Sequence, residues 1–399
     1  MLSLAEARRR AAAAEPAPAR RVPLGEAGGL ISAEGVRARL DIPHVSTSAM
    51  DGWAVSDAGS HGGWEVIPER AEGPADILPA LRPGQAAGVV TGSPVPEGTV
   101  SVLRQEHSEH SQRSLRALPE TPDLEPGRNI RPRGVEASQG DSLLPAGVRI
   151  TPARAAAAAV AGYDELLARP APTVRLVLTG TEVVTSGIPG PGQVRDVFGV
   201  ALPSMLTGLG AVPAASARLQ DDLGQMLEQL RTASEDVVIT TGGTAHSRAD
   251  VLRPALEKLG AEIVVDSVDI RPGHPALLAR HAQRWVLGLP GNPLAGFAAL
   301  SALGVPLLSA LAGRTAPSLR LTAAEQLTGA RRGLRLLPAS AAQDGVRASG
   351  HDKSHMMRGL AEADVFAVVP PAGISAGEPV ECFEVPGALP SLRRTHEEQ

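Results

Sequence analysis

The 399-residue sequence contains one cysteine and only eight aromatic residues, namely four Phe, three Trp and one Tyr. A single cysteine excludes an internal disulfide framework and any zinc or iron–sulfur site that needs several cysteines. So few aromatic side chains argue against a surface on which single-stranded nucleic acid stacks. The formal net charge of −5 provides no overall basic surface for nucleic acid either.

Long apolar runs are missing as well. No apolar run reaches the roughly 18 residues that a membrane-spanning helix needs. The longest apolar stretch, at about 294–312, contains Pro306 and two glycines, and it predicts a buried helix. The first residues carry charges where a signal peptide needs its apolar core. The sequence therefore predicts a cytoplasmic protein without membrane contact.

Three common catalytic motifs are absent from the sequence. It lacks the GxSxG nucleophile turn, the GxxxxGK[ST] phosphate loop and the GxGxxG dinucleotide fingerprint. Their absence argues against a serine hydrolase, an ATPase of the common type and a standard dinucleotide-dependent enzyme.

Glycine and proline are abundant, with 43 and 35 residues that make up about a fifth of the chain, against a usual ~12%. Hydrophobic residues make up 43% of the chain, enough to build sizeable cores from Leu, Val, Ile and Ala. The length suggests two to four domains at very roughly 150 residues each.

The pattern of apolar residues changes along the chain. Short apolar runs broken by glycine and proline predict a small β-rich domain from 22 to about 120. An alanine-rich segment, 152–168, predicts a helix with a proline in its first turn. From 172 strands alternate with helices, which predicts a parallel sheet covered on both faces. Short apolar runs return over 317–399 and predict a second small β domain.

Several glycine-rich turns directly follow the predicted strands, where ligands bind in parallel sheets. TGG at 241–243 can bring backbone N–H groups to an anion, and Asp250 can hold magnesium or simply cap a helix. GLPGNP at 288–293 is either a ligand-contacting loop or a plain strand–helix connection. RPGHP at 271–275 offers Arg271 to an oxyanion, or it is a solvated loop. The Asp51–Gly52 pair in SAMDGWAV is either functional or a common turn.

Taken together and in this order, the motifs resemble the molybdopterin molybdenumtransferases, the MoeA/gephyrin E-domain family of molybdenum cofactor biosynthesis. The resemblance runs from about residue 20 to the end of the chain. It rests on SAMDGWAV (48–55), TGSPVPEG (91–98), GRNIRPRG (127–134), GDSLLPAG (140–147), TGTE (179–182), TGG with Asp250 (241–250), RPGHP (271–275), GLPGNP (288–293) and SHMMRGLAEAD (354–364).

The resemblance implies a multidomain α/β plus β fold in an elongated, MoeA-like subunit that forms a homodimer. A linker domain would comprise 1–22 and 135–171, and a β-rich domain would comprise 23–134. A MogA-like, doubly wound α/β domain that binds molybdopterin would span 172–313, and a C-terminal β-barrel domain 314–399. The active site would lie between the α/β domain of one subunit and the β-rich domain of the other.

The implied activity is that of a transferase that inserts molybdate into adenylylated molybdopterin and releases AMP. Mg²⁺ or another divalent cation would assist, and a molybdopterin adenylyltransferase is a candidate partner. Anionic ligands of this kind suit glycine-rich helix N-termini, a few arginines and a carboxylate-bound cation. The sequence does not distinguish molybdate from tungstate or identify the metal.

The resemblance also assigns roles to individual residues. The catalytic residues would be Asp51 and Thr91 from the partner copy, with Glu182, Asp222 and Asp250 on the α/β side. The last three would also bind the metal, and Asp221 is left open as an alternative to Asp222. The substrate and anion site would comprise Gly242, Gly243, Arg271, His274, Pro290, Gly291, Asn292, Pro293 and Ser354.

Some positions depart from the family pattern. The usual KPGKP carries Arg271 and His274 in place of both lysines, and Thr181 replaces an acid in TGDE. Ala245, Ser247 and Arg248 change the segment after TGG, and Asp196-Val197-Phe198 stands for D-S-N. These changes leave two alternatives open. One is a catalytically impaired paralogue that binds molybdopterin or a partner as a scaffold, and the other is a pterin or nucleotide enzyme of different specificity.

Overall fold

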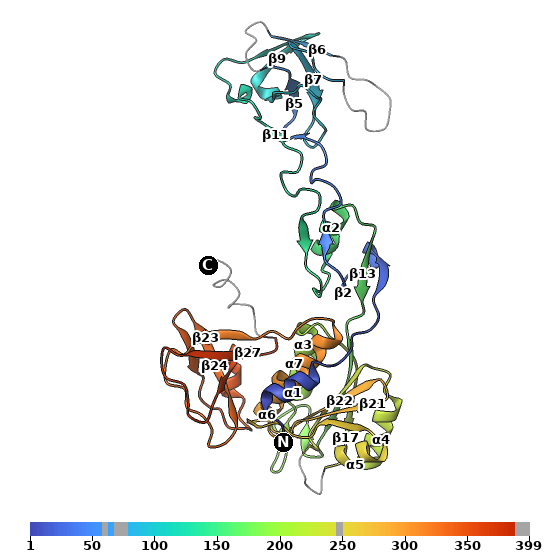
Figure 1. Ribbon diagram of the computed structural model, residues 1–399, viewed down its shortest axis with the longest axis vertical. Coiled ribbons are helices and arrows are strands. Elements are labelled where there is room, and N and C mark those ends of the chain that lie inside the picture. The colour runs from blue at the N-terminus through green and yellow to red at the C-terminus, as the bar shows by residue number, and fades with distance from the viewer. Residues whose placement is uncertain (58–62, 68–78, 245–249, 388–399) are drawn as a thin grey trace.

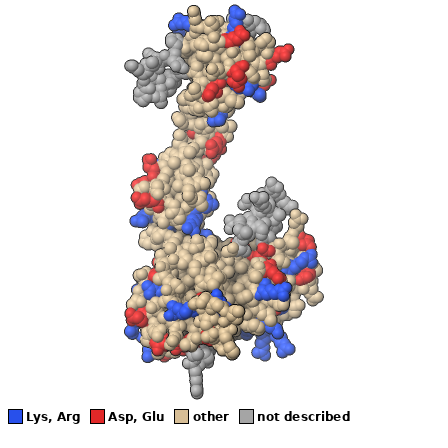
Figure 2. Space-filling model, turned by 180° about the vertical axis from the view of Figure 1, so that it is seen from behind, with Lys and Arg blue, Asp and Glu red and all other residues tan. Residues whose placement is uncertain are grey.

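The computed structural model describes residues 1–57, 63–67, 79–244 and 250–387. The subunit is elongated, with a rounded tip at one end, a slender rod in the middle and a wide body at the other end (Figure 1). The chain begins in the body, runs out along the rod to the tip, returns along the rod and completes the body. Arginines and acidic residues are scattered together over the face seen in Figure 2, with no broad basic surface there.

The tip consists of a six-stranded, largely antiparallel sheet in the order β8-β5-β7-β6-β10-β9. A two-stranded ladder of β4 and β11 lies at its base. The strands are β4 (Thr47–Ser48), β5 (Gly52–Val55), β6 (Trp64–Val66), β7 (Gln85–Val89), β8 (Ser101–Arg104), β9 (Ser108–Ser111), β10 (Ser114–Ala117) and β11 (Ile130–Arg131).

The rod is built from two separate stretches of the chain. Its elements are β1 (Arg20–Pro23), β2 (Ile31–Ser32), β3 (Val36–Arg37), β12 (Ser142–Leu144), helix α2 (Pro152–Val160) and β13 (Glu165–Arg169). Strand β13 pairs with β1 and β2, and β12 pairs with β3. Residues 31–37 therefore lie in the rod, whereas the sequence-based division placed them with the β-rich domain.

The predicted helix over 152–168 is wrong in its second half. Thr151 caps α2 by accepting a hydrogen bond from the backbone of Arg154 at 3.3 Å, and Pro152 stands in the first turn. The helix ends at Val160, and Gly162 then adopts φ +88°, a conformation that favours glycine. The chain that follows becomes β13 because its backbone pairs with β1 and β2.

The N-terminal helix α1 (Leu4–Ala11) belongs to the body in the structure. Leu4, Ala7 and Ala11 are buried in one cluster with the apolar helices of the α/β unit. The Arg8 guanidinium lies 4.0 Å from the ring centre of Phe383 in the C-terminal domain. The structure thus differs from the sequence-based division, which grouped all of 1–22 with the linker domain.

The α/β unit contains a six-stranded sheet in the order β17-β14-β18-β22-β21-β19. The first four strands are parallel, and β21 and β19 are antiparallel additions. The strands are β14 (Thr173–Thr179), β17 (Val212–Leu219), β18 (Val237–Thr241), β19 (Glu262–Val265), β21 (Leu277–His281) and β22 (Arg284–Leu289). A side pair is formed by β15 (Val183–Val184) and β16 (Val194–Arg195).

Helices cover both faces of this sheet, as the sequence predicted. Helix α3 (Phe198–Gly208) packs in the large cluster on one face, together with α1. Helices α4 (Leu223–Thr232) and α5 (Leu252–Lys258) form a second cluster on the other face. Strand β14 serves both, because Leu176 and Leu178 join the first cluster while Val177 joins the second.

The apolar stretch near 294–312 forms the continuous helix Pro293–Leu311, described as α6 (Pro293–Ala299), a π-helical turn (Leu300–Gly304) and α7 (Val305–Leu311). By length and composition it could cross a membrane, yet 94% of its apolar window is buried inside the protein. The prediction of a buried helix is confirmed.

The C-terminal domain is a barrel-like sheet of β23 (Leu319–Thr322), β24 (Leu334–Ala342), β25 (Gly345–Ala348), β26 (Val365–Val369) and β27 (Pro379–Glu384). Strand β23 is at one edge of the sheet, and β25 pairs with β24 near the other edge. A bridge between Ala323 and Val346 joins the end of β23 to β25 and so curls the sheet toward closure. Strand β20 (Ile270–Arg271) leaves the α/β unit and pairs with β24. The short helix α8 (Arg358–Ala361) lies beside β24.

Candidate functional site

A cavity of about 680 Å³ lies at the carboxyl ends of the four parallel strands. Each strand leads into it through the residues that follow its last position. Its lining includes Gly180 after β14, Asp221 after β17, Gly242 after β18 and Gly291 after β22. This is the edge at which open α/β sheets bind ligands, and it is where the sequence placed its glycine-rich turns.

Close packing beside β14 requires glycine at position 242. Gly242 has φ +84°, and a Cβ atom there would lie 2.8 Å from the Thr179 hydroxyl oxygen. That hydroxyl donates a hydrogen bond to the Thr241 carbonyl at 2.6 Å. The α-carbon of Gly242 also lies 3.5 Å from the point where a Cβ of Gly291 would stand. The TGG and PGN turns therefore lie against each other at the mouth of the sheet.

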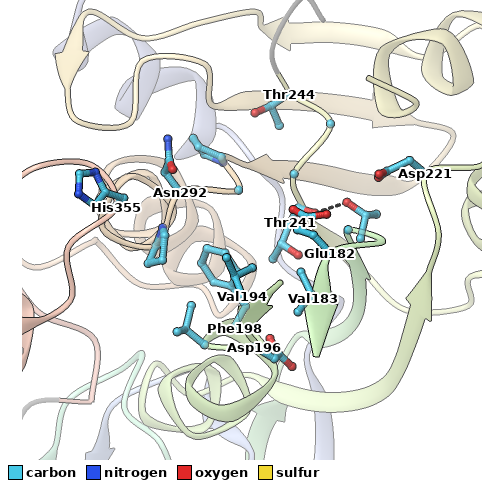
Figure 3. Close-up of a pocket in the computed structure, with 18 of the residues that line it drawn as sticks. Glu182, Val183, Val194, Asp196, Phe198, Asp221, Thr241, Thr244, Asn292 and His355 are labelled. Carbon is cyan, nitrogen blue, oxygen red and sulfur yellow. Dashed lines mark hydrogen bonds between the residues drawn. The ribbon is translucent and has the colours of Figure 1, made fainter. Parts of the chain in front are cut away.

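Two carboxylates line the cavity on the side of β14 and β17. Glu182 follows the first strand and Asp221 follows the second. Asp221 accepts a hydrogen bond from the Thr181 hydroxyl at 3.2 Å. In the described part of the chain, the Glu182 carboxylate accepts no hydrogen bond. Figure 3 shows both acids across the cavity from Asn292 and His355.

The adjacent carboxylates Asp221 and Asp222 have different surroundings. The Asp222 side chain accepts a hydrogen bond from the backbone N–H of Gln225 at 2.7 Å and caps helix α4. Its oxygen is thus used in satisfying the first turn of that helix. Asp221 is the one of the two that lines the cavity. The geometry therefore favours Asp221 at the position that the sequence left open.

Asp250 lies under the TGG turn and is 9% exposed. Its Oδ1 accepts hydrogen bonds from the backbone of Leu252 at 3.1 Å and of Arg253 at 3.4 Å, and its Oδ2 lies 3.7 Å from Arg253 Nε. A Cβ on Gly243 would stand 3.5 Å from Asp250 Oδ1. Asp250 thus holds the start of α5 against the turn, as its helix-capping interpretation predicted. Ala245, Ser247 and Arg248 lie outside the described residues.

The third wall of the cavity comes from β15, β16 and the start of α3. Val183, Val194 and Phe198 provide apolar surface there, and the Phe198 ring packs 5.3 Å from the ring of Phe297. Asp196 on the same segment forms an ion pair with Arg218 of β17. In the sequence, Asp196 and Phe198 were notable only as part of the segment that replaces D-S-N, and no signal singled out Arg218.

The RPGHP segment lies beside the cavity, and its side chains bond to their own loop. Arg271 donates to the carbonyl of Ile270 at 2.8 Å, and the His274 ring lies 3.3 Å from the carbonyl of Val268. Pro275, the last residue of the motif, is the one that lines the cavity. A Cβ on Gly273 would stand 3.2 Å from the Ala295 carbonyl, so the motif packs on the start of α6.

The C-terminal domain contributes at the same place. The backbone carbonyl of Ser354 accepts a hydrogen bond from Ala295 at 3.2 Å, and His355 lines the cavity. Pro290, Gly291, Asn292 and Pro293 line it as well. The predicted residues of the GLPGNP motif therefore line the cavity together with the TGG turn, whereas Ser354 is not part of the lining and its neighbour His355, which was not predicted for the anion site, is.

Asp51 and Thr91 lie in the tip, at the opposite end of the subunit from this cavity (Figure 1). Thr91 donates its backbone N–H at 2.7 Å and its hydroxyl at 2.9 Å to the same oxygen of Asp51. The backbone hydrogen bond and, to a lesser extent, the hydroxyl hydrogen bond hold the pKa of the Asp51 carboxyl below its ordinary value. Within one copy of the chain, Asp51 and Thr91 are therefore far from the predicted site in the α/β unit.

Among the residues that the structure describes, no group of three or more His, Cys, Asp or Glu side chains is arranged to hold a metal ion. The predicted set of Glu182, Asp222 and Asp250 is accordingly not gathered as a preformed cage. Mg²⁺ commonly keeps several waters and binds through one or two carboxylates plus substrate phosphates. Two of the acids that line the cavity, Glu182 and Asp221, meet that smaller requirement.

Most of the chain matches family models for molybdenum cofactor biosynthesis. Residues 2–162 match the MoeA N-terminal region (domain I and II), 175–310 match a probable molybdopterin binding domain, and 320–384 match the MoeA C-terminal region (domain IV). Together these three segments include the tip and most of the rod, the α/β unit and the C-terminal domain.

Similar proteins carry one functional name. The molybdopterin molybdenumtransferase of Synechococcus elongatus is 31% identical over 92% of this chain and 94% of its own length. That of a Nostoc species is 33% identical over 73% of this chain and 69% of its own. A solved structure of the molybdopterin biosynthesis MoeA protein from Pyrococcus horikoshii superposes with a TM-score of 0.73 at 24% identity, covering 96% of this chain and 99% of that one, and it shares the fold.

Proposed function

The chain belongs to the MoeA family of molybdopterin molybdenumtransferases, and on that premise we propose that it inserts molybdate into adenylylated molybdopterin with release of AMP. Homologues with this transferase name align over most of the chain. The observation that carries the proposal is the meeting of the TGTE, TGG and GLPGNP turns around one cavity that also holds Glu182 and Asp221.

The turns would bind the anionic parts of the substrate. Backbone N–H groups in the turns after β18 and β22 are the donors that suit phosphate or molybdate oxygens. The apolar wall formed by Val183, Val194 and Phe198 would contact the pterin ring system of the substrate and exclude water from one of its faces. Glycine at 242 lets the TGG turn lie against β14 and beside the GLPGNP turn, so that both turns would contact one ligand.

Glu182 and Asp221 would hold the divalent cation. When bound there, the cation would supply positive charge that neutralises phosphate oxygens. Asp221 is oriented by the Thr181 hydroxyl. Thr181 is the residue that stands in place of the acid of the usual TGDE motif. Asp250 would act indirectly by fixing the TGG turn through the start of α5.

A homodimer would complete the site. Asp51 and Thr91 form a preorganised, exposed pair far from their own α/β cavity (Figure 1). A second copy in the arrangement that the resemblance implies would bring its tip to the cavity of the first. We further propose a cytoplasmic location and a molybdopterin adenylyltransferase as the supplier of the substrate.

The test mixes purified protein with adenylylated molybdopterin, molybdate and MgCl₂ and measures AMP. Release above a protein-free blank supports the proposal, and its absence contradicts it. The variants Arg271→Lys, His274→Lys and Thr181→Asp, made together, address the scaffold alternative. AMP release only by the restored protein would assign the natural chain to binding without turnover. Neither the comparisons nor the described residues favour that alternative.

A further inference from the structure

Arg218 is the guanidinium that β17 presents to the cavity. It lines the cavity, and its side chain is 30% exposed. One of its terminal nitrogens, Nη2, is bonded to Asp196 Oδ2. Within the described residues, its Nε and Nη1 groups make no hydrogen bond. The side chain is therefore held at one nitrogen while its other donors are left for a ligand.

Asp196 is fixed firmly enough to orient that guanidinium. Its side chain is only 10% exposed, and Oδ1 accepts a hydrogen bond from the backbone N–H of Gly199 at 2.9 Å in the first turn of α3. A Cβ on Gly199 would collide with Asp196 Oδ2. Glycine at 199 thus provides the space in which the carboxylate sits.

The charges around the cavity indicate a role in ligand binding for the Arg218–Asp196 pair. The lining carries three carboxylates, on Glu182, Asp196 and Asp221, and two arginines, Arg195 and Arg218. A doubly charged oxyanion would be repelled by this lining unless a cation faced it. A guanidinium forks onto the oxygens of a tetrahedral anion with two parallel hydrogen bonds.

We propose that Arg218 binds a tetrahedral oxyanion of the substrates, either the phosphate of the nucleotide part or molybdate, and that Asp196 is its positioning residue. The ligand identity rests on the proposed function. Arg195 is the matched contrast. It lines the same cavity but is exposed, and among the described residues its side chain makes one hydrogen bond, of 3.5 Å to the Val184 carbonyl.

The first experiment measures binding by calorimetry to the full-length protein and to the variants Arg218→Ala, Arg218→Lys and Arg195→Ala. The probes are AMP, molybdate and, as an uncharged control, adenosine. Removing a charged hydrogen bond weakens binding by about 10- to 100-fold. We expect Arg218→Ala to show that loss for AMP or molybdate and no change for adenosine, with partial recovery in Arg218→Lys and little change in Arg195→Ala. The probe that loses affinity identifies the anion.

The second experiment tests the positioning role through Asp196→Asn and Gly199→Ala. Both leave Arg218 in place but disturb its anchor, so KM for the adenylylated substrate should rise about tenfold with a smaller change in kcat. A fall in kcat in both variants without a change in KM or in probe affinity would overturn the positioning role.

The outcomes separate this inference from the proposed function. If the natural protein releases AMP and Arg218→Ala binds every probe as tightly, Arg218 is a structural ion-pair residue and the inference fails alone. If no AMP is released but Arg218→Ala selectively loses an anionic probe, the proposed function fails and the anion site stands. Failure of the natural protein to bind AMP or molybdate at all overturns the anion site.

Discussion

The hydroxyl of Thr179 stands 2.8 Å from the position that a Cβ of Gly242 would occupy. The same hydroxyl donates to the Thr241 carbonyl at 2.6 Å, so it cannot turn away without losing that bond. A side chain at 242 would therefore displace the TGG turn from β14. This contact gives the glycine-rich motif a structural requirement that can be measured.

Gly242→Ala should lower the free energy of unfolding by about 1–3 kcal/mol, because alanine is strained at φ +84° and its Cβ would lie too close to Thr179. Its AMP release should fall together with stability because the turn lines the cavity. Gly260→Ala is the control, with φ +64° and no atom within 4 Å of its Cβ. We expect a smaller loss of stability there and unchanged AMP release. Equal activity in the two variants would contradict a binding role for the turn.

Asp221→Ala and Asp222→Ala should separate the two acids. The first should abolish most AMP release or shift its Mg²⁺ dependence upward, because Asp221 lines the cavity. The second should lose about 1 kcal/mol of stability with the cap of α4 and keep its AMP release. The measurements are urea unfolding and AMP release over a Mg²⁺ titration. The reverse pattern would return the role to Asp222.

A mixture of Asp51→Asn and Glu182→Gln proteins should be more active than either alone. If each site draws on two copies, a mixed dimer contains one site with neither substitution. Random exchange in a two-fold dimer then gives roughly a quarter of the natural activity. Two different affinity tags would verify that mixed dimers form. Mixed dimers without recovered activity would contradict a site shared between copies.

The tip should lose stability in acid through Asp123, which is fully buried. Burial by itself would raise the pKa of Asp123, but hydrogen bonds from Arg104, Asn129 and His107 outweigh it and lower the pKa to about 2. The depressed pKa stabilises the fold above the ordinary carboxyl value of about 3.9, and this contribution is lost as the pH falls through about 2.

Asp123→Asn should therefore be less stable than the natural protein by about 2 kcal/mol at neutral pH, and the difference should shrink toward pH 2. Thermal or urea unfolding at several pH values measures it, and Glu109→Gln, at an exposed position of β9 in the tip, is the comparison. A difference that does not change with pH would assign the effect of Asp123 to packing.

Cys382 should be inert in the folded protein. Burial, with a further contribution from the neighbouring Glu381, raises the pKa of this thiol to about 12. Since the thiolate is the reactive form, iodoacetamide at pH 8 should label the chain only after unfolding in urea. Mass spectrometry gives a direct count, because the chain has no other cysteine. Rapid labelling of the native protein would contradict the buried position.

The sheet and its cavity were accessible to sequence reasoning because each signal was local. Strands such as 173–179 and 237–241 are short apolar runs, and each is followed by its own glycine-rich turn. Parallel strands meet at one edge, so these turns had to converge. The long apolar helix was predictable for the same reason.

Other features depend on contacts distant in sequence. Val212–Leu219 alternates between exposed and half-buried residues, so β17 and its Arg218 gave no strong apolar signal. Asp221 and Asp222 are adjacent and of one residue type, and only their contacts with Thr181 and with the first turn of α4 distinguish them. The second half of 152–168 is a strand because β1 and β2 are there to pair with it.

The path of the chain has a consequence for how the body is assembled. Helix α1 is synthesised before the rest of the body, yet the elements on which it packs, namely β19, the π-helical turn and α7, begin only at Glu262. At 5–20 residues per second the nascent helix waits on the order of tens of seconds for them. An isolated helix this short is marginally stable in water, so α1 should remain unpacked while the rod and the tip, which are synthesised next, fold. A body expressed without its rod and tip would close a much shorter loop, and it should then acquire its N-terminal helix sooner.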